Sequence, residues 1–211
     1  MSADLPDWRG RDVVCIASGP SLTRADVELV RSSGLPAIVC NTSFRLAPWA
    51  DALFAFDFKY WGTVDPATGI SYLEETARDF RGLRYCRSEL AKSLPGLISC
   101  FGRPWFWGFG NSGICAVTLA QAAGARRAIL LGYDCKLGAD GSPHWHGKHP
   151  EPRTNCVSLP KWPDQFRRLA KLSKARGFRV VNATRDTALD CFARMPLEDA
   201  LERATAEEVT P

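Results

Sequence analysis

The residues with the clearest capacity for chemistry lie in one segment, SPHWHGKH, which holds all three histidines of the sequence, at 144, 146 and 149. Imidazole titrates near neutral pH, so His144 and His146 are candidates for a general base that takes a proton from an attacking hydroxyl. The three rings, with Asp134 or Cys135, are also a candidate metal shell. Side chains two residues apart point to opposite sides of an extended chain, so joint ligation requires a turn here.

A second segment of interest is VVCIASGPSL, residues 13–22. An apolar run leads into a tight loop, and Thr23 with Asp26 is typical of the cap and first turn of a helix that ends near Gly34. A glycine lets the backbone pass close to a ligand, and the helix directs backbone NH groups and its positive dipole end to the same point. The pattern favours a phosphate or another anion, although ordinary α/β turns share it. The loop residues are Ser18, Gly19, Pro20 and Ser21.

Polar residues also stand where further apolar segments end. Asn41 and Thr42 follow AIVC, Asp57 follows ALFAF, Asp134 follows the run AILLGY, and Asn182 follows RVV. Any one of them is typical of a turn. Because ligands of parallel sheets bind at the carboxyl ends of the strands, these positions together with Ser18 predict a polar cleft.

The segment PWFWGFGNSG, residues 104–113, combines four aromatic side chains with three glycines. Such rings either form a stacking platform for a base or sugar or cover the core beneath a loop. Ser112 opens a predicted helix that ends at Gly124. The four aromatic residues are Trp105, Phe106, Trp107 and Phe109.

Strand and helix patterns alternate along the chain, and the apolar strands show little polar alternation. This predicts an α/β fold: a single domain over residues 1–211 with a mainly parallel sheet covered by helices on both faces. Helices are predicted over 72–80 and 162–176, the second with a basic, solvated face, and a last strand ends at Asn182. Residues 135–160 form a long loop of the kind that is usually functional or disordered, and 196–211 a terminal helix and tail.

The composition limits the class of protein. The chain has 211 residues, 45% of them hydrophobic, and a net charge of +4 without blocks of one sign, which suits anionic small molecules. No apolar run reaches the length of a membrane helix, and the first residues lack a signal-peptide pattern, so a cytoplasmic protein without a membrane partner is expected. The eight cysteines contain no CxxC pair, which predicts free thiols rather than disulfides or a cysteine zinc site.

Two common nucleotide signatures are absent from the sequence. ASGPS carries one glycine where a dinucleotide fingerprint needs GxGxxG, and Gly147-Lys148 is followed by His149 rather than Ser or Thr. A standard dinucleotide dehydrogenase and a P-loop kinase are therefore disfavoured.

Four segments, in order, resemble a known family: ASGPSL, VCNTSF, GNSGICAVTLAQAAGARRAILLGYD and RVVNATRDTALDCF. They are similar to glycosyltransferase family 42, the bacterial sialyltransferases, and equally to the related domain of unknown function 115. The latter includes flagellin-glycosylation factors and archaeal 6-hydroxymethylpterin diphosphokinases, and similar short proteins are encoded by tailed phages. The resemblance covers residues 13–197, and a phage origin would place the protein in the cytoplasm of a bacterial host.

The resemblance implies a Rossmann-like nucleotide-binding sheet, so that the predicted fold is a single Rossmann-like domain, with the nucleotide held by three parts of the chain. It also implies His144 as the base, His146 as the next choice, and no required metal. The sequence departs from the family pattern at two places that concern the nucleotide-sugar donor. The family's GNGPS is ASGPS here, and two tyrosines that assist the departing phosphate are replaced by Lys136 and roughly Ser142. Lys136 is then the candidate to supply charge. The implied nucleotide contacts are Ser18, Gly19, Pro20, Ser21, Asn41, Thr42, Asn111, Ser112 and Gly113.

The sequence thus leads to a first hypothesis, a glycosyltransferase that uses a nucleotide-activated sugar. A second is a Mg²⁺-dependent diphosphokinase of the pterin type, with Asp57 and Asp134 holding the metal. A third is the histidine metal site, and a fourth is a non-catalytic module that binds nucleotides or nucleic acid. The acceptor (small molecule, glycan, protein or DNA base) and the formation of a homo-oligomer stay open.

Overall fold

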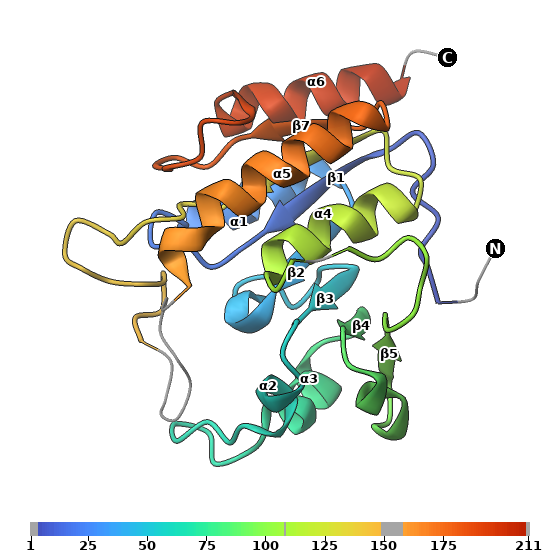
Figure 1. Cartoon of the computed structure of the whole chain (residues 1–211). Coiled ribbons are helices and arrows are strands. Elements are labelled where there is room, and N and C mark those ends of the chain that lie inside the picture. The colour runs from blue at the N-terminus through green and yellow to red at the C-terminus, as the bar shows by residue number, and fades with distance from the viewer. Residues whose placement is uncertain (1–3, 108, 149–157, 210–211) are drawn as a thin grey trace.

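A computed structural model describes residues 4–107, 109–148 and 158–209. It contains one sheet of eight strands, all parallel, with helices on both faces, which confirms the predicted α/β Rossmann-like fold (Figure 1). The spatial order is β5-β4-β3-β2-β1-β6-β7-β8. The strands are β1 (Asp12–Ile16), β2 (Ala37–Cys40), β3 (Ala52–Phe54), β4 (Leu83–Cys86), β5 (Leu97–Ser99), β6 (Arg127–Leu131), β7 (Arg179–Asn182) and β8 (Ala193–Arg194).

The strand order reverses at the centre of the sheet. The chain proceeds outward from β1 to β5 and then returns to place β6 on the other side of β1, in register from Asp12 opposite Arg127 to Ile16 opposite Leu131. In open parallel sheets a crevice forms at the carboxyl ends of the strands where the order reverses. The topology therefore puts the most favourable ligand position beyond Ile16 and Leu131.

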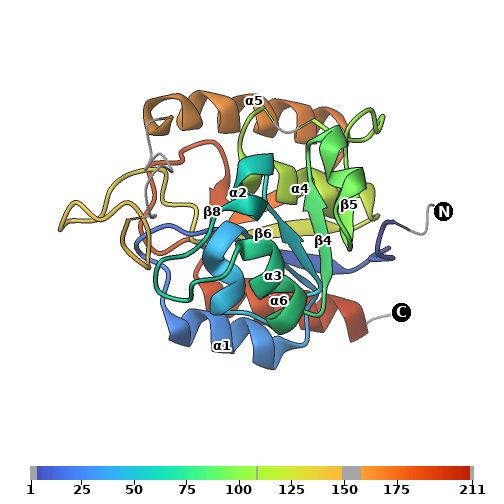
Figure 2. The ribbon, with the colours of Figure 1, turned by 90° about the horizontal axis from the view of Figure 1, so that it is seen from below.

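Two helical layers cover the sheet. Figures 1 and 2 show α4 and α5 on one face and α1 and α6 on the other. The α-helices are α1 (Arg24–Ser33), α2 (Phe58–Gly62), α3 (Tyr72–Asp79), α4 (Ser112–Ala122), α5 (Trp162–Ala175) and α6 (Leu197–Val209). Short 3-10 turns are η1 (Asn41–Arg45), η2 (Glu89–Ser93) and η3 (Leu159–Lys161).

Burial on both faces explains the uninterrupted apolar strands. Val13 and Cys15 of β1 belong to the core cluster under α4 and α5, whereas Val14 and Ile16 belong to the cluster under α1 and α6. All five residues of β1 are buried, because successive side chains of a strand point to opposite faces.

The local signals placed most boundaries correctly. Thr23 caps α1 with a capping box, in which its side chain accepts the Asp26 amide at 3.2 Å, and the helix is followed by Gly34 in the left-handed region. Two expectations need correction. The apolar run that starts at Ala52 leaves the sheet after Phe54, and Asn182 does not end the last strand, because the two-residue β8 follows it.

The described residues also bear on the predictions about the cysteines, membrane helices and the long loop. Their seven cysteines are free thiols, as predicted, while Cys156 lies outside them. Within the same residues, no helix combines the length and apolar character needed to cross a bilayer. Residues 135–148 contain no helix or strand, and the remainder of the predicted long loop falls largely outside the described ranges.

A buried ion pair ties the amino ends of β1 and β6. The Arg127 guanidinium donates to the Asp12 carboxylate, with Nε 2.8 Å from Oδ2, and both side chains are almost fully buried. Arg126 donates to the other carboxylate oxygen at 2.9 Å. Charges removed from water are stable only when paired, so this edge of the sheet depends on Arg127.

We expect Arg127→Ala to lower the free energy of unfolding by about 3 kcal/mol, because it leaves the buried carboxylate of Asp12 with one cation instead of two. Urea denaturation measures the change. Arg167→Ala, which removes an exposed cation paired with Asp164 and Asp190, is the control and should cost less than about 1 kcal/mol. Equal losses in the two variants would contradict this role of the buried pair.

Candidate functional site

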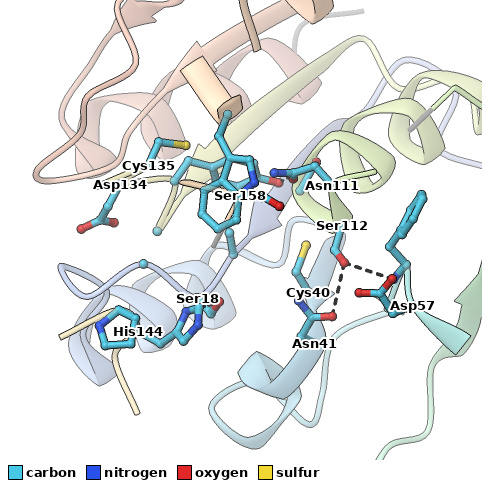
Figure 3. Close-up of a pocket in the computed structure, with 18 of the residues that line it drawn as sticks. Ser18, Cys40, Asn41, Asp57, Asn111, Ser112, Asp134, Cys135, His144 and Ser158 are labelled. Carbon is cyan, nitrogen blue, oxygen red and sulfur yellow. Dashed lines mark hydrogen bonds between the residues drawn. The ribbon is translucent and has the colours of Figure 1, made fainter. Parts of the chain in front are cut away.

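A cavity of about 640 Å³ opens at the carboxyl edge of the sheet, beside the point where the strand order reverses. Figure 3 shows residues from the loop after β1, from β2, the β3–α2 connection, the start of α4 and the loop after β6 around it. Its size is within the range of small-molecule and cofactor sites. Eleven predicted site residues line it: Ser18, Gly19, Pro20, Asn41, Asp57, Asn111, Ser112, Gly113, Asp134, Lys136 and His144.

The loop after β1 is fixed to the loop after β6. The Gly19 amide donates to the Gly132 carbonyl at 2.8 Å, and the Ser21 amide donates to Oδ2 of Asp134 at 2.8 Å. A Cβ on Gly19 would lie 2.0 Å from Oδ1 of Asp134, so only glycine allows this approach. Asp134 therefore shapes the Ser-Gly-Pro-Ser loop from a position over a hundred residues away in the chain.

Ser112 joins three parts of the cavity wall. Its hydroxyl donates to Oδ1 of Asn41 at 3.3 Å and accepts the Phe56 amide at 3.1 Å, which links the ends of β2 and β3 to the start of α4 (Figure 3). Asn41 has a φ of 49°, a left-handed conformation that asparagine adopts more readily than most residues. The amide side chain is thereby turned into the cavity.

The amino end of α4 lies in the cavity wall. The Asn111 side chain caps it by accepting the Ile114 amide at 3.2 Å, and the Tyr133 hydroxyl donates to the Gly113 carbonyl at 3.1 Å. A Cβ on Gly113 would lie 2.7 Å from the Tyr133 ring, so this position also requires glycine. The helix thus directs the positive end of its dipole and its first backbone amides toward the cavity, which favours a bound anion.

His144 is anchored beside the loop after β1. Its Nδ1 lies 3.2 Å from Oγ of Ser18, and the ring is almost fully buried in the cavity wall. The next residue, Trp145, donates its amide to the Ser18 carbonyl at 3.2 Å and its indole NH to Oγ of Ser43 at 3.2 Å. Ser43 in turn donates to the Ala17 carbonyl at 2.9 Å. Three hydrogen bonds therefore hold the histidine segment, and a fourth ties Ser43 to the loop after β1.

The charged groups of the cavity fall into two kinds. Asp134 is buried, and its Oδ1 has no hydrogen-bond partner among the described residues. Burial raises the pKa of the Asp134 carboxyl above its usual value, opposed by the Ser21 amide and assisted by the charge of Asp186. Lys136 lies closer to solvent and pairs with Asp186 at 2.6 Å.

Four predicted residues do not line the cavity. Ser21 faces Asp134 through its amide, and Thr42 is buried within η1. His146 stacks on His144, with ring centroids 5.1 Å apart. Asn182 is fully buried at the end of β7, where its Oδ1 accepts the Thr184 amide at 3.0 Å. These side chains support the residues of the cavity wall or the sheet.

The aromatic segment covers the core rather than forming a platform at the cavity. Phe106 stacks on Phe54 with centroids 5.8 Å apart, and Trp105, Trp107 and Phe109 pack against the same core cluster. None of the four lines the cavity. Their glycine-rich spacing was compatible with either role, because sequence does not tell which face of a loop meets the sheet.

Several lining residues were not predicted. Trp162 and Phe166 contribute from α5, and Lys59 and Tyr60 from α2. Trp162 and Phe166 are four residues apart, which places both on one helix face. In the sequence this spacing indicated packing on the core but gave no sign that the two side chains line a cavity. Cys135, also in the wall, has a φ of 52°, and such strain is enriched at functional sites.

Within residues 4–107, 109–148 and 158–209, no group of three or more His, Cys, Asp or Glu side chains is arranged to hold a metal ion. His144 and His146 do lie at a turn, as joint ligation required. His149 lies outside the described residues, so the three-histidine site stays a prediction.

Comparison of the sequence with protein-family models and with curated proteins gives no match.

Gly19→Ala should lower the free energy of unfolding by about 1–3 kcal/mol, because the added methyl group displaces the Asp134 carboxylate from the loop. Gly62→Ala is the matched control, since nothing lies within 4 Å of its Cβ position, and it should change stability by less than about 0.5 kcal/mol. Chemical denaturation of both variants measures the difference. A Gly19→Ala protein as stable as the control would disprove the close approach.

The raised pKa of Asp134 also predicts that the stability of the protein depends on pH. A carboxyl group whose folded pKa lies above its ordinary value of 3.8 destabilises the fold once it ionises, so its contribution becomes less favourable as pH rises through that range. Asp134→Asn stays neutral and keeps an oxygen for the Ser21 amide. Its unfolding free energy relative to the wild type should therefore increase between about pH 4 and about pH 7. A difference that does not change with pH would contradict the raised pKa.

Proposed function

We propose that the protein is a transferase that binds a nucleotide-activated sugar in this cavity and uses His144 to activate an acceptor hydroxyl. The observation that carries the proposal is the convergence of the amino end of α4, the loop after β1 and a buried histidine on one cavity at the reversal of strand order. The first two elements suit a diphosphate, and the third suits proton transfer.

The phosphate end of the donor is placed against residues 18–20 and the amino end of α4. There the backbone amides of Ser112 and Gly113 and the ammonium group of Lys136 are positioned to stabilise negative charge on a departing nucleotide. The apolar wall formed by Phe56, Trp162 and Phe166 offers surface for the base or sugar ring. This wall extends the contacts expected from the sequence.

In the proposed step the acceptor oxygen attacks the anomeric carbon of the sugar while the bond from that carbon to the phosphate oxygen breaks. The nucleotide leaves with the electron pair of that bond, and the proton of the acceptor hydroxyl passes to His144. If Nδ1–H donates to Oγ of Ser18, then Nε2 carries the lone pair that takes this proton. In that tautomer Ser18 orients the ring and Nε2 acts as the base.

A thermal-shift screen against CMP, UMP, GDP, ATP, CMP-sugars and UDP-sugars, each with and without Mg²⁺, tests the binding part. Because a ligand of the native state raises the melting temperature by mass action, one nucleotide family should stabilise the protein without metal. A shift that requires ATP and Mg²⁺ together would instead support a diphosphokinase, in which Asp57 and Asp134 hold the metal. No shift with any compound would contradict nucleotide binding.

His144→Ala tests the chemical part. We expect it to lower turnover by about 10²-fold or more while the thermal shift from the nucleotide persists, because general-base catalysis typically contributes that much. His146→Ala is the matched control and should retain most activity, since its ring does not line the cavity. Full activity in His144→Ala, or loss confined to His146→Ala, would reject His144 as the base.

A further inference from the structure

We propose that the outer face of α5 binds the phosphate backbone of duplex DNA. This basic face consists of four exposed side chains: Arg168, Lys171 and Lys174 of α5, and Arg176, which directly follows the helix. None of the four forms an ion pair within the parts of the chain that the structure describes, whereas the neighbouring Arg167 is neutralised by Asp164 and Asp190. The sequence predicted a merely solvated face, but uncompensated cations along one helix are the electrostatic feature that a polyanion recognises.

Two of these cations are held in place by aromatic rings. The Arg168 guanidinium lies 4.4 Å from the centroid of Phe109, and that of Arg176 lies 4.8 Å from the centroid of Trp107. Gln165 fastens the aromatic segment to α5 by donating to the Phe109 carbonyl at 2.9 Å. Stacking restricts both arginines before binding, so less side-chain entropy is lost when they contact phosphate.

The spacing of the face suits an extended anion. Arg168 and Lys174 are six residues apart, which corresponds to about 9 Å along α5, with Lys171 between them, and Arg176 follows the end of the helix. Figure 2 shows α5 at the outer surface of the molecule, on the face of the sheet opposite α1 and α6. A duplex that lies along this helix therefore meets several cations in succession.

The apolar residues of the surface favour DNA over a membrane or a protein. The exposed large hydrophobic residues of the described chain lie elsewhere, at Leu29, Val64, Leu83, Leu90, Phe101 and Leu137. Helices that insert into a bilayer interface need an apolar face, and protein interfaces need a desolvated apolar centre. Non-specific DNA binding needs neither, because contacts between cations and phosphates supply nearly all of it.

The basic face begins beside the cavity but does not depend on the chemistry there. Trp162 and Phe166, in the first turns of α5, line the cavity, so a duplex along the helix reaches its rim. Binding to this face needs no nucleotide in the cavity. A failure of the proposed transferase activity therefore leaves the DNA proposal intact, and the reverse also holds.

Fluorescence anisotropy with a labelled duplex of about 20 base pairs, over about 50 to 200 mM salt, tests the proposal. The triple variant Arg168→Gln, Lys171→Gln, Lys174→Gln should weaken binding about tenfold or more at low salt and reduce the salt slope by about 2 to 3. The control removes three exposed cations from other parts of the surface: Arg24→Gln, Arg31→Gln and Lys92→Gln. It should bind within about twofold of the wild type, because its charges lie outside the proposed contact.

Three results would overturn the proposal. The first is that the wild-type protein does not bind the duplex at low salt. The second is that the two triple variants lose the same amount of affinity for the duplex. The third is that the protein binds phosphatidylserine vesicles but not the duplex. Melting temperatures of both variants check that the fold is retained. If the α5 triple variant is unfolded, Lys171→Gln alone replaces it, and it should still weaken binding relative to Lys92→Gln.

Discussion

The pairing between β1 and β6 is the interaction on which the rest of the structure depends, and it continues beyond the ends of the two strands. Ala17 donates its amide to the Leu131 carbonyl and Gly19 donates to the Gly132 carbonyl, both at 2.8 Å. Asp134 then accepts the Ser21 amide. Because this contact lies where the strand order reverses, it fixes the floor of the cavity and the direction in which α1 leaves the sheet.

The same contact carries a cost in stability that the surrounding fold must offset. Asp134 is buried with one oxygen that has no hydrogen-bond partner among the described residues, and Asn41 and Cys135, which line the same cavity, occupy left-handed conformations. Buried, unsatisfied groups and strained backbone each destabilise a protein, typically by about 1–3 kcal/mol. Their concentration at one cavity, with paired β-strands on either side, is the pattern expected where a ligand rather than the core has selected the residues.

The basic face and the cavity share α5, which gives this helix two roles. Its buried side, with Phe166 and Leu169, packs on the sheet, and its first turn closes the cavity. Its exposed side presents cations whose position depends on the aromatic segment that precedes α4. Two of the rings that the sequence offered as a stacking platform, Trp107 and Phe109, thus support arginine side chains instead.

The sequence was sufficient for those features that local physical chemistry determines. Apolar runs buried on both faces predicted a parallel sheet, and Thr23, Asp26 and Gly34 predicted both ends of α1. Polar residues at strand ends predicted most of the cavity, because parallel strands bring their carboxyl ends to one edge.

Features that depend on distant contacts could not be predicted in this way. β8 has only two residues, both exposed, and pairs with β7 through its backbone alone. Asn182 has the same local pattern as Asn41, yet its side chain bonds to the following loop, whereas Asn41 meets Ser112 across the sheet. The anchoring of His144 through Trp145 and Ser43 likewise joins segments about a hundred residues apart.

The most direct test of the central claim is hydrogen–deuterium exchange with CMP, UMP, GDP and ATP added in turn. Binding at the β1–β6 contact predicts slower exchange of the backbone amides of residues 17–21 and 111–114 with one of these nucleotides, since both segments line the cavity or hold its wall. Residues 194–198, which line the smaller cavity beside Arg194, should be unaffected. Protection confined to residues 194–198, or no protection with any nucleotide, would contradict the account.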